Sequence, residues 1–227
     1  RDDDDDSGDN NTGNTANNNN DSYAVPPVIP YQTQGVIFND IQSIGSNKPI
    51  MQILEELQQA GIKDVKATDW FSGPVTVIVQ SGLLKPSEDG MFHPEADVSL
   101  AEGIAVFAKV IGIAAKDDTP SEAVAKMQEA GLLGDNMDTS RGMSRLDVAK
   151  LLGKALGVEP AVITSRDQYP FADFDEITPQ ERGIVKAMYD LGIIKGYFED
   201  GIRTFRPDTI LTRAQLAILV DRVLGAH

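Results

Sequence analysis

The residues with the clearest chemical potential are two arginines that stand where helices are expected to begin. Arg213 directly follows Thr212 and Arg145 directly follows Ser144, hydroxyl residues of the kind that cap helix N-termini. The helix macrodipole disfavours a cation at this end by roughly 0.3–1 kcal/mol, so an arginine there needs a compensating anion. A bound ligand would supply one if the free backbone N–H groups and the guanidinium converged on it. The alternative is an ion pair with the carboxylate of a neighbouring repeat, which this acidic chain can offer.

Catalytic side chains form no recognisable set. The chain has no cysteine and two histidines, His93 and the terminal His227. It lacks the Gly-x-Ser-x-Gly, P-loop and His-Glu-x-x-His motifs. The acidic runs Asp2–Asp6 and Glu199–Asp200 do not have the spacing of an EF-hand. We therefore expect no catalytic residue, no bound metal and no cofactor.

The two arginines belong to a repeated pattern. Three segments align without a gap and close on glycine, at residues 97–112, 142–157 and 210–225. Each is preceded by a second alignable piece, at residues 74–84, 123–133 and 183–194. The pattern predicts a mostly α-helical chain of three helix-loop-helix repeats, because a single repeat of this size could not bury its apolar face alone.

Helix starts are marked by a hydroxyl three residues before an acid or amide, which is the spacing of a capping box. The pairs with this spacing are Ser99/Glu102, Thr119/Glu122, Ser144/Asp147, Thr178/Glu181 and Thr212/Gln215. The last helix is apolar almost all round, so it needs partners on several sides. Three equivalent helices could bury one another.

Motifs in the last third of the chain closely resemble the S-layer homology (SLH) domain. They are Phe171-x-Asp173-Phe174, Gly192-Ile193-Ile194-Lys195-Gly196, Phe205-x-Pro207 and Leu211-Thr212-Arg213-Ala214-Gln215. The resemblance is dense over residues 171–225, good over 64–112 and partial over 118–157. It implies three SLH repeats in a pseudo-threefold arrangement around a central three-helix bundle.

The resemblance also implies a function. SLH domains anchor bacterial surface proteins, non-covalently, to an acidic and often pyruvylated secondary cell-wall polysaccharide attached to peptidoglycan. The expected location is extracellular, at the cell wall or surface layer. Protein contacts with neighbouring surface-layer subunits are the alternative role, and a glycan hydrolase is a more distant one.

The resemblance assigns ligand binding to the residues Arg213, Thr212, Gln215, Arg145, Ser144, Asp173, Asp64, Trp70 and Gly196. Trp70 could stack on a sugar ring or pack as core. Asp64 and Asp173 could accept hydrogen bonds from sugar hydroxyls or cap the adjacent turn. Both alternatives stay open on sequence grounds.

The implied grooves lie between neighbouring repeats and are unequal. Arg145 is expected to work with Asp173, and Arg213 with Asp64 and its neighbour Trp70. In the remaining groove Leu100 stands where the family has arginine, and the second copy lacks both the Phe-x-Asp opening and the Phe-x-Pro loop. We therefore expect two grooves, not three, to bind the anionic sugar.

The chain divides into segments of different character. We expect a disordered acidic and Asn-rich linker at residues 1–30 and a partial repeat-like helical segment at residues 31–61. Three SLH repeats are expected at residues 62–112, 113–158 and 169–227, and the second of them is degenerate. The net charge of −15 includes −6 from one arginine and seven aspartates in the linker, which leaves −9 for the rest. This charge argues against nucleic acid as the main partner. No apolar run approaches the ~20 residues of a membrane span, and any signal peptide is expected to lie outside these residues.

Overall fold

A computed structural model describes residues 48–225 and shows a mostly helical protein. The expected linker and the first part of the partial repeat, residues 31–47, lie outside the described residues. The helices are α1 Ile50–Gln59, α2 Ser72–Gln80, α3 Leu100–Val110, α4 Pro120–Glu129, α5 Arg145–Ala155, α6 Pro179–Asp190 and α7 Arg213–Gly225. Two 3₁₀ turns, Arg166–Gln168 and Phe174–Glu176, precede α6.

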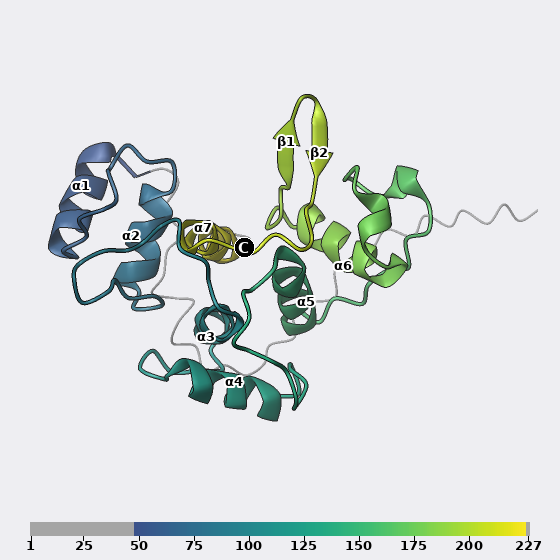
Figure 1. Ribbon diagram of the computed structural model, residues 1–227, viewed down its shortest axis with the longest axis horizontal. Coiled ribbons are helices and arrows are strands. Elements are labelled where there is room, and N and C mark those ends of the chain that lie inside the picture. Colours follow the sequence, from purple (N-terminus) through teal and green to yellow (C-terminus); the bar gives the residue numbers. More distant parts are fainter. Residues whose placement is uncertain (1–47, 226–227) are drawn as a thin grey trace, which may run out of the picture.

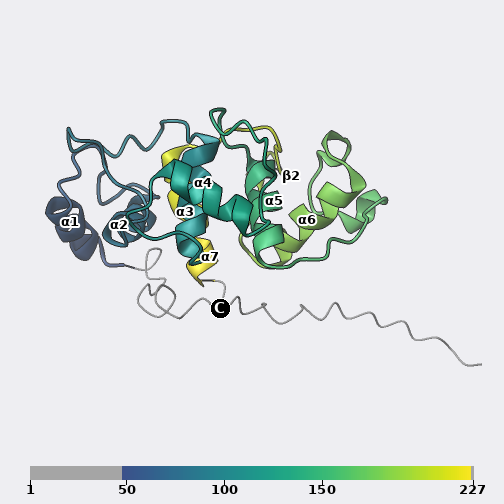
Figure 2. The ribbon, with the colours of Figure 1, turned by 90° about the horizontal axis from the view of Figure 1, so that it is seen from below.

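Helices α3, α5 and α7 lie around the middle of the molecule, with α2, α4 and α6 outside them (Figure 1). The closest pairings are α2 with α7, α4 with α3 and α6 with α5, while α1 packs on the outer side of α2. Seen from below, α1 and α2 occupy one end and α6 the other, with α3, α4 and α7 between them (Figure 2). Each of the outer helices α2, α4 and α6 therefore packs on a central helix other than the one that follows it in the chain.

The segments just before α3, α5 and α7 are joined by a closed cycle of backbone hydrogen bonds. Val98 N–H donates to Leu211, Leu211 N–H to Met143, and Met143 N–H back to Val98, each at 2.9 Å. Isolated β-bridges pair the same segments at Asp97–Thr212, Ser99–Gly142 and Ser144–Ile210. The starts of the three central helices are thereby held to one another.

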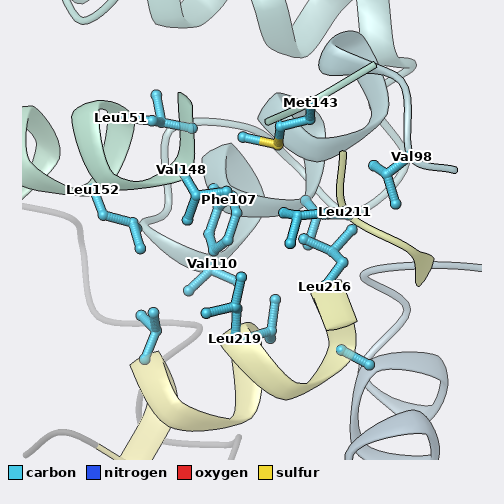
Figure 3. Close-up of a cluster of buried hydrophobic side chains, with 14 of the residues drawn as sticks. Val98, Phe107, Val110, Met143, Val148, Leu151, Leu152, Leu211, Leu216 and Leu219 are labelled. Atoms are coloured by element: carbon cyan, nitrogen blue, oxygen red, sulfur yellow. The ribbon is translucent and has the colours of Figure 1, made fainter. Parts of the chain in front are cut away.

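The core lies directly behind this cycle (Figure 3). Phe107 of α3, Leu152 of α5 and Leu216 of α7 are fully buried. Leu219 of α7 is 6% exposed and lies among them. The apolar character of α7 follows from its position, because it packs against α2 on one side and α3 on another.

The predicted caps are present. Capping boxes start α4 at Thr119, α5 at Ser144 and α6 at Thr178. Reciprocal bonds of 3.3 Å join Thr212 and Gln215. At α3 the cap is half of the expected box, because Ser99 accepts from the N–H of Glu102 but the Glu102 carboxylate does not return to Ser99.

The loop between α6 and α7 contains a hairpin that the sequence reasoning did not predict. Strands β1 Tyr197–Glu199 and β2 Ile202–Thr204 pair antiparallel, with Tyr197 opposite Thr204. The turn Asp200–Gly201 has positive φ at both residues, as an Asp-Gly hairpin turn requires. The hairpin projects from the helices beside α5 and α7 (Figure 1).

Candidate functional site

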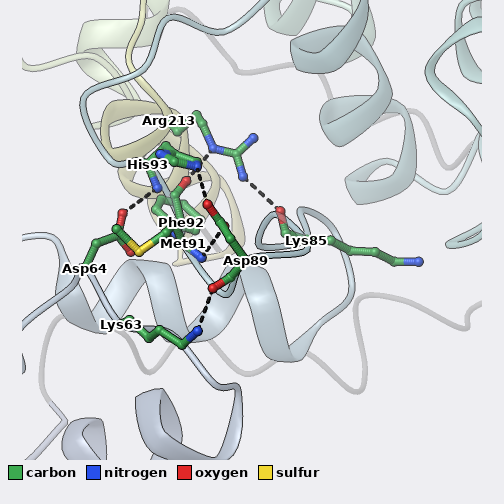
Figure 4. A network of polar contacts seen from close by, with 8 residues as sticks. All are labelled: Lys63, Asp64, Lys85, Asp89, Met91, Phe92, His93 and Arg213. Atoms are coloured by element: carbon green, nitrogen blue, oxygen red, sulfur yellow. Dashed lines mark hydrogen bonds and ion pairs between the residues drawn. The ribbon is translucent and has the colours of Figure 1, made fainter.

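Two aspartates hold the loops that carry the Phe-x-Pro motifs. The Asp64 carboxylate accepts from the N–H groups of Phe92 and His93, both at 2.7 Å (Figure 4). Asp173 accepts in the same way from Phe205 at 2.9 Å and Arg206 at 2.6 Å. The expectation that these carboxylates cap the adjacent turn was therefore wrong, because their partners lie about thirty residues along the chain.

The clamped loops share an unusual backbone. His93 and Arg206 have backbone φ angles of 56° and 58°, in the left-handed region that residues other than glycine rarely adopt. Each precedes a proline and follows a fully buried phenylalanine, Phe92 or Phe205. The Asp–N–H bonds and the buried ring together hold the strained residue in place. The two phenylalanine rings fill the core beneath these loops.

Arg213 is fully engaged by protein partners (Figure 4). Its Nε donates to the Phe92 carbonyl at 2.7 Å, and its Nη2 donates to the Lys85 carbonyl at 2.9 Å. Its Nη1 pairs with the carboxylate of Glu102, which belongs to α3. The guanidinium also lies 4.9 Å from the Phe92 ring centre. At this arginine, the alternative of an ion pair with a neighbouring repeat is the one observed.

Arg145 occupies the matching place against the third repeat's loop, with different neighbours. Its Nε donates to the Phe205 carbonyl at 2.7 Å, and its Cζ lies 4.7 Å from the centre of the Tyr197 ring. Within residues 48–225 it forms no ion pair with a carboxylate. Burial lowers the pKa of the Arg145 guanidinium and Arg222 lowers it further, while Tyr197 and the more distant carboxylate of Asp173 partly oppose this shift. This cation is held by a carbonyl and an aromatic ring rather than by an acid.

The backbone at the start of these helices is not free to bind an anion. Arg145 N–H donates to Thr209 at 3.0 Å and Leu146 N–H to Pro207 at 3.0 Å. Arg213 N–H and Ala214 N–H bond the first repeat's loop in the same way, at 2.9 Å each. The expectation that free N–H groups and guanidinium converge on a ligand was therefore wrong in its first half. Of the two arginines, Arg145 is the one whose guanidinium forms no ion pair within residues 48–225, because that of Arg213 is bound to Glu102.

The third groove has a different surface. Leu100 takes the arginine's place, and Ala101 N–H bonds the Thr139 carbonyl where the other repeats offer a proline carbonyl. Met137 lies two residues before Thr139, just as Phe92 and Phe205 lie two residues before the proline of their loops. Met137 is 39% exposed, whereas both phenylalanines are buried. A pocket of about 130 Å³ opens here, lined by Leu100, Ile104, Leu132, Leu133, Met137, Met143, Asp147, Lys150, Leu151 and Lys154. It is mostly apolar.

The remaining predicted site residues are placed as follows. Ser144 and Thr212 serve as N-caps, and Gln215 donates from Nε2 to the Tyr197 hydroxyl at 3.3 Å. Trp70 is 74% exposed and meets Phe71 edge to face, so it is not core. Gly196 has a φ of 72°, and a Cβ there would lie 2.4 Å from the Phe171 ring. Close packing therefore requires glycine at position 196.

Sequence reasoning missed two residues that shape the grooves. Glu102 was expected only as a capping residue, yet it crosses to Arg213. Tyr197 was not singled out, although it contacts Arg145 and Gln215. Its position directly after Gly196, within a long loop, was the available signal.

Two surveys of residues 48–225 bear on other kinds of function. No group of three or more His, Cys, Asp or Glu side chains is arranged to hold a metal ion. None of the helices described there combines the length and apolarity that a membrane crossing requires.

Comparison with known proteins identifies similar sequences. The model of the S-layer homology domain matches residues 61–102 and 170–217. A middle cell wall protein of Brevibacillus brevis is 30% identical over 98 residues, 42% of this chain and 9% of that protein. The surface-layer 125 kDa protein of Lysinibacillus sphaericus is 22% identical over 173 residues, 70% of this chain and 14% of that protein. The S-layer protein sap of Bacillus anthracis is 25% identical over 175 residues, 70% of this chain and 20% of that protein. The matched stretches thus span a fifth or less of these relatives.

Proposed function

The chain carries S-layer homology domains at residues 61–102 and 170–217, and from this premise we propose that it is an anchoring module. It attaches a surface protein non-covalently to the bacterial cell wall by binding an acidic, pyruvylated secondary cell-wall polysaccharide. It acts at the cell surface, as a binding module and not as an enzyme. The surface-layer and cell-wall names of its relatives support this location.

The observation that carries the proposal is the environment of Arg145. A partly buried guanidinium without a carboxylate partner is costly unless an anion reaches it. The ring of Tyr197, which is partly exposed, lies 4.7 Å from the guanidinium carbon and provides an aromatic face beside the charge. A sugar ring that carries a carboxylate presents the matching pair of surfaces, an apolar face and an anion.

The three repeats are proposed to form a pseudo-threefold ring with one groove between each neighbouring pair. The closed hydrogen-bond cycle of Val98, Met143 and Leu211 supports this arrangement. Two grooves keep an arginine, Arg145 against the third repeat's loop and Arg213 against the first repeat's loop. Two weak sites on one chain hold firmly to a repeating polymer, because the second contact is intramolecular.

The aspartates and Trp70 take different parts in this proposal. Asp64 and Asp173 shape the grooves through the loops they clamp. Trp70 offers an exposed ring on which a sugar could stack. Gly196, Ser144 and Thr212 act through the backbone they position.

Co-sedimentation tests the proposal. The chain is mixed with native cell walls, with protein-stripped walls and with walls whose polysaccharide has been removed by acid. We expect the chain to sediment with native walls and with protein-stripped walls, and to stay in solution with acid-treated walls. Arg145→Gln should reduce sedimentation, whereas Arg166→Gln, an exposed arginine paired with Asp175, should not. Equal sedimentation with acid-stripped walls would refute polysaccharide binding.

Assembly with neighbouring protein subunits is the second candidate, and one observation favours it. Phe198 and Ile202 on the projecting hairpin are 67% and 55% exposed. Apolar side chains presented in this way are typical of protein contacts. If the hairpin is an assembly contact, the chain should self-associate in sedimentation velocity runs without polysaccharide, and Phe198→Ser should abolish the association.

A further inference from the structure

The third residue of each central helix faces one groove, and it differs among the three. At the Arg213 groove this residue is Glu102, whose carboxylate pairs with the guanidinium. At the Arg145 groove it is Gln215, a neutral amide that donates to the Tyr197 hydroxyl. Of the two grooves that have an arginine, one therefore has a resident carboxylate and the other does not.

We propose that this position determines how strongly each groove attracts the anionic ligand. Glu102 competes with the ligand for Arg213, whereas Gln215 leaves Arg145 open, so the Arg145 groove is the stronger site. The inference rests on the proposed function, because it assigns unequal affinities to the two grooves through which the polysaccharide is held.

The geometry shows that Glu102 is committed to this contact. At α4, α5 and α6 the acidic residue in this position turns back to bond the N-cap N–H. Glu102 makes no such return bond and instead crosses to another repeat's arginine. An incoming carboxylate would have to displace Glu102 and leave it partly buried beside a second negative charge.

At the Arg145 groove the residue from the start of the neighbouring helix is neutral. Gln215 keeps its own capping bonds to Thr212, so the amide satisfies the helix start without adding charge. Burial and Arg222 lower the pKa of Arg145, whereas Tyr197 and Asp173 raise it. The Asp173 carboxylate is bonded to the N–H groups of Phe205 and Arg206 and does not form an ion pair with Arg145. An anion that enters this groove replaces no protein acid.

Reciprocal substitutions test the proposal by titration calorimetry. The probe is a hexose methyl glycoside carrying a pyruvate ketal, and the same glycoside without the ketal is the neutral control. With Arg145→Gln in the background, only the Arg213 groove remains, and Glu102→Gln should tighten the charged probe by about 3- to 10-fold. With Arg213→Gln in the background, Gln215→Glu should weaken it by a similar factor.

Controls separate competition from a structural effect. Glu122→Gln alters a capping residue of α4 outside both grooves and should leave the affinity unchanged. A merely structural effect of Glu102→Gln would change the affinities of charged and neutral probes together, whereas competition changes only the charged one. Circular dichroism verifies equal helicity, and Arg145→Met, which also removes the cation, replaces Arg145→Gln if the latter fails to fold.

The outcomes distinguish a failure of the proposed function from a failure of the competition by Glu102. An intact chain that binds the charged probe no better than the neutral one overturns the proposed function and this inference with it. If the intact chain binds the charged probe but Glu102→Gln leaves its affinity unchanged, the function stands and the competition by Glu102 is refuted.

Discussion

The loops that follow α2 and α6 differ from the loop that follows α4 in two linked ways. The first two bury a phenylalanine, Phe92 or Phe205, and are clamped by an aspartate, Asp64 or Asp173. The loop after α4 has neither feature and presents Met137, partly exposed, at the corresponding place. Because the aspartate bonds the N–H of the phenylalanine itself, loss of the loop leaves the carboxylate without a partner. The second repeat accordingly lacks both motifs together.

This comparison explains why Arg145, Arg213 and Leu100 have different surroundings. Where the phenylalanine is buried, its carbonyl receives the Nε of Arg145 or Arg213. Where the phenylalanine is missing, Leu100 faces an apolar pocket. The surroundings of Arg145 and Arg213 therefore depend on three parts that support one another: the aspartate that bonds the loop, the buried phenylalanine and the arginine.

The largest expected effect comes from truncating a buried phenylalanine in one of these loops. Phe205→Ala should lower the free energy of unfolding by about 3–5 kcal/mol, because the ring is fully buried and a cavity would remain. Met137→Ala, the matched change in the second repeat, should cost much less because Met137 is partly exposed. Urea unfolding followed by circular dichroism measures both. Similar losses in the two variants would mean that the second loop is packed as tightly as the others.

The next test removes the charge of a carboxylate that bonds one of these loops. Asp173→Asn should destabilise the protein by about 1.5–3 kcal/mol, because a charged acceptor of two backbone N–H groups is lost. Asp138, which bonds only Ser140 in the second repeat's loop, provides the control, and Asp138→Asn should have a smaller effect. Unfolding in urea again gives the values. A harmless Asp173→Asn would show that the buried ring alone holds the loop.

Local features of this structure could be predicted from the sequence because they depend on nearby residues. The capping boxes at Thr119, Ser144 and Thr178 follow from side chains three residues apart. The placement of Arg145 beside the third repeat and Arg213 beside the first followed from the repeat alignment and the family resemblance. Both arginines lie against those loops in the structure.

Features that depend on long-range pairing could not be predicted. The spacing of Ser99 and Glu102 is that of a capping box, and nothing local shows that Glu102 turns to an arginine 111 residues away. The N–H groups at the starts of α5 and α7 bond loop carbonyls of other repeats, which repeat alignment cannot show. The hairpin at Tyr197–Thr204 lies in a segment too short for a reliable periodic signal.

A smaller test fills the pocket of the second repeat. Met137→Phe restores the residue type found at the corresponding position of the other loops, and should stabilise the protein by about 1 kcal/mol if the ring enters the pocket. Thermal unfolding with and without the change measures the effect. A destabilised variant would mean that the shorter loop does not direct residue 137 toward the pocket.

The smallest effect concerns the acid at the start of α5, which pairs within its own repeat whereas Glu102 pairs across repeats. Burial alone would raise the pKa of Asp147, but hydrogen bonds from Arg141 and Ser144 hold it below its usual value of 3.8. A carboxyl with a depressed folded-state pKa contributes stability above its unfolded pKa and loses that contribution as pH falls through the folded pKa. Asp147→Asn should therefore cost about 0.5–1 kcal/mol at neutral pH, a modest value because water screens the half-exposed Arg141. The difference in free energy of unfolding between the parent and Asp147→Asn should shrink below about pH 4, and urea titrations across this range measure it. A difference that stays constant with pH would assign the effect to packing of the side chain and not to its charge.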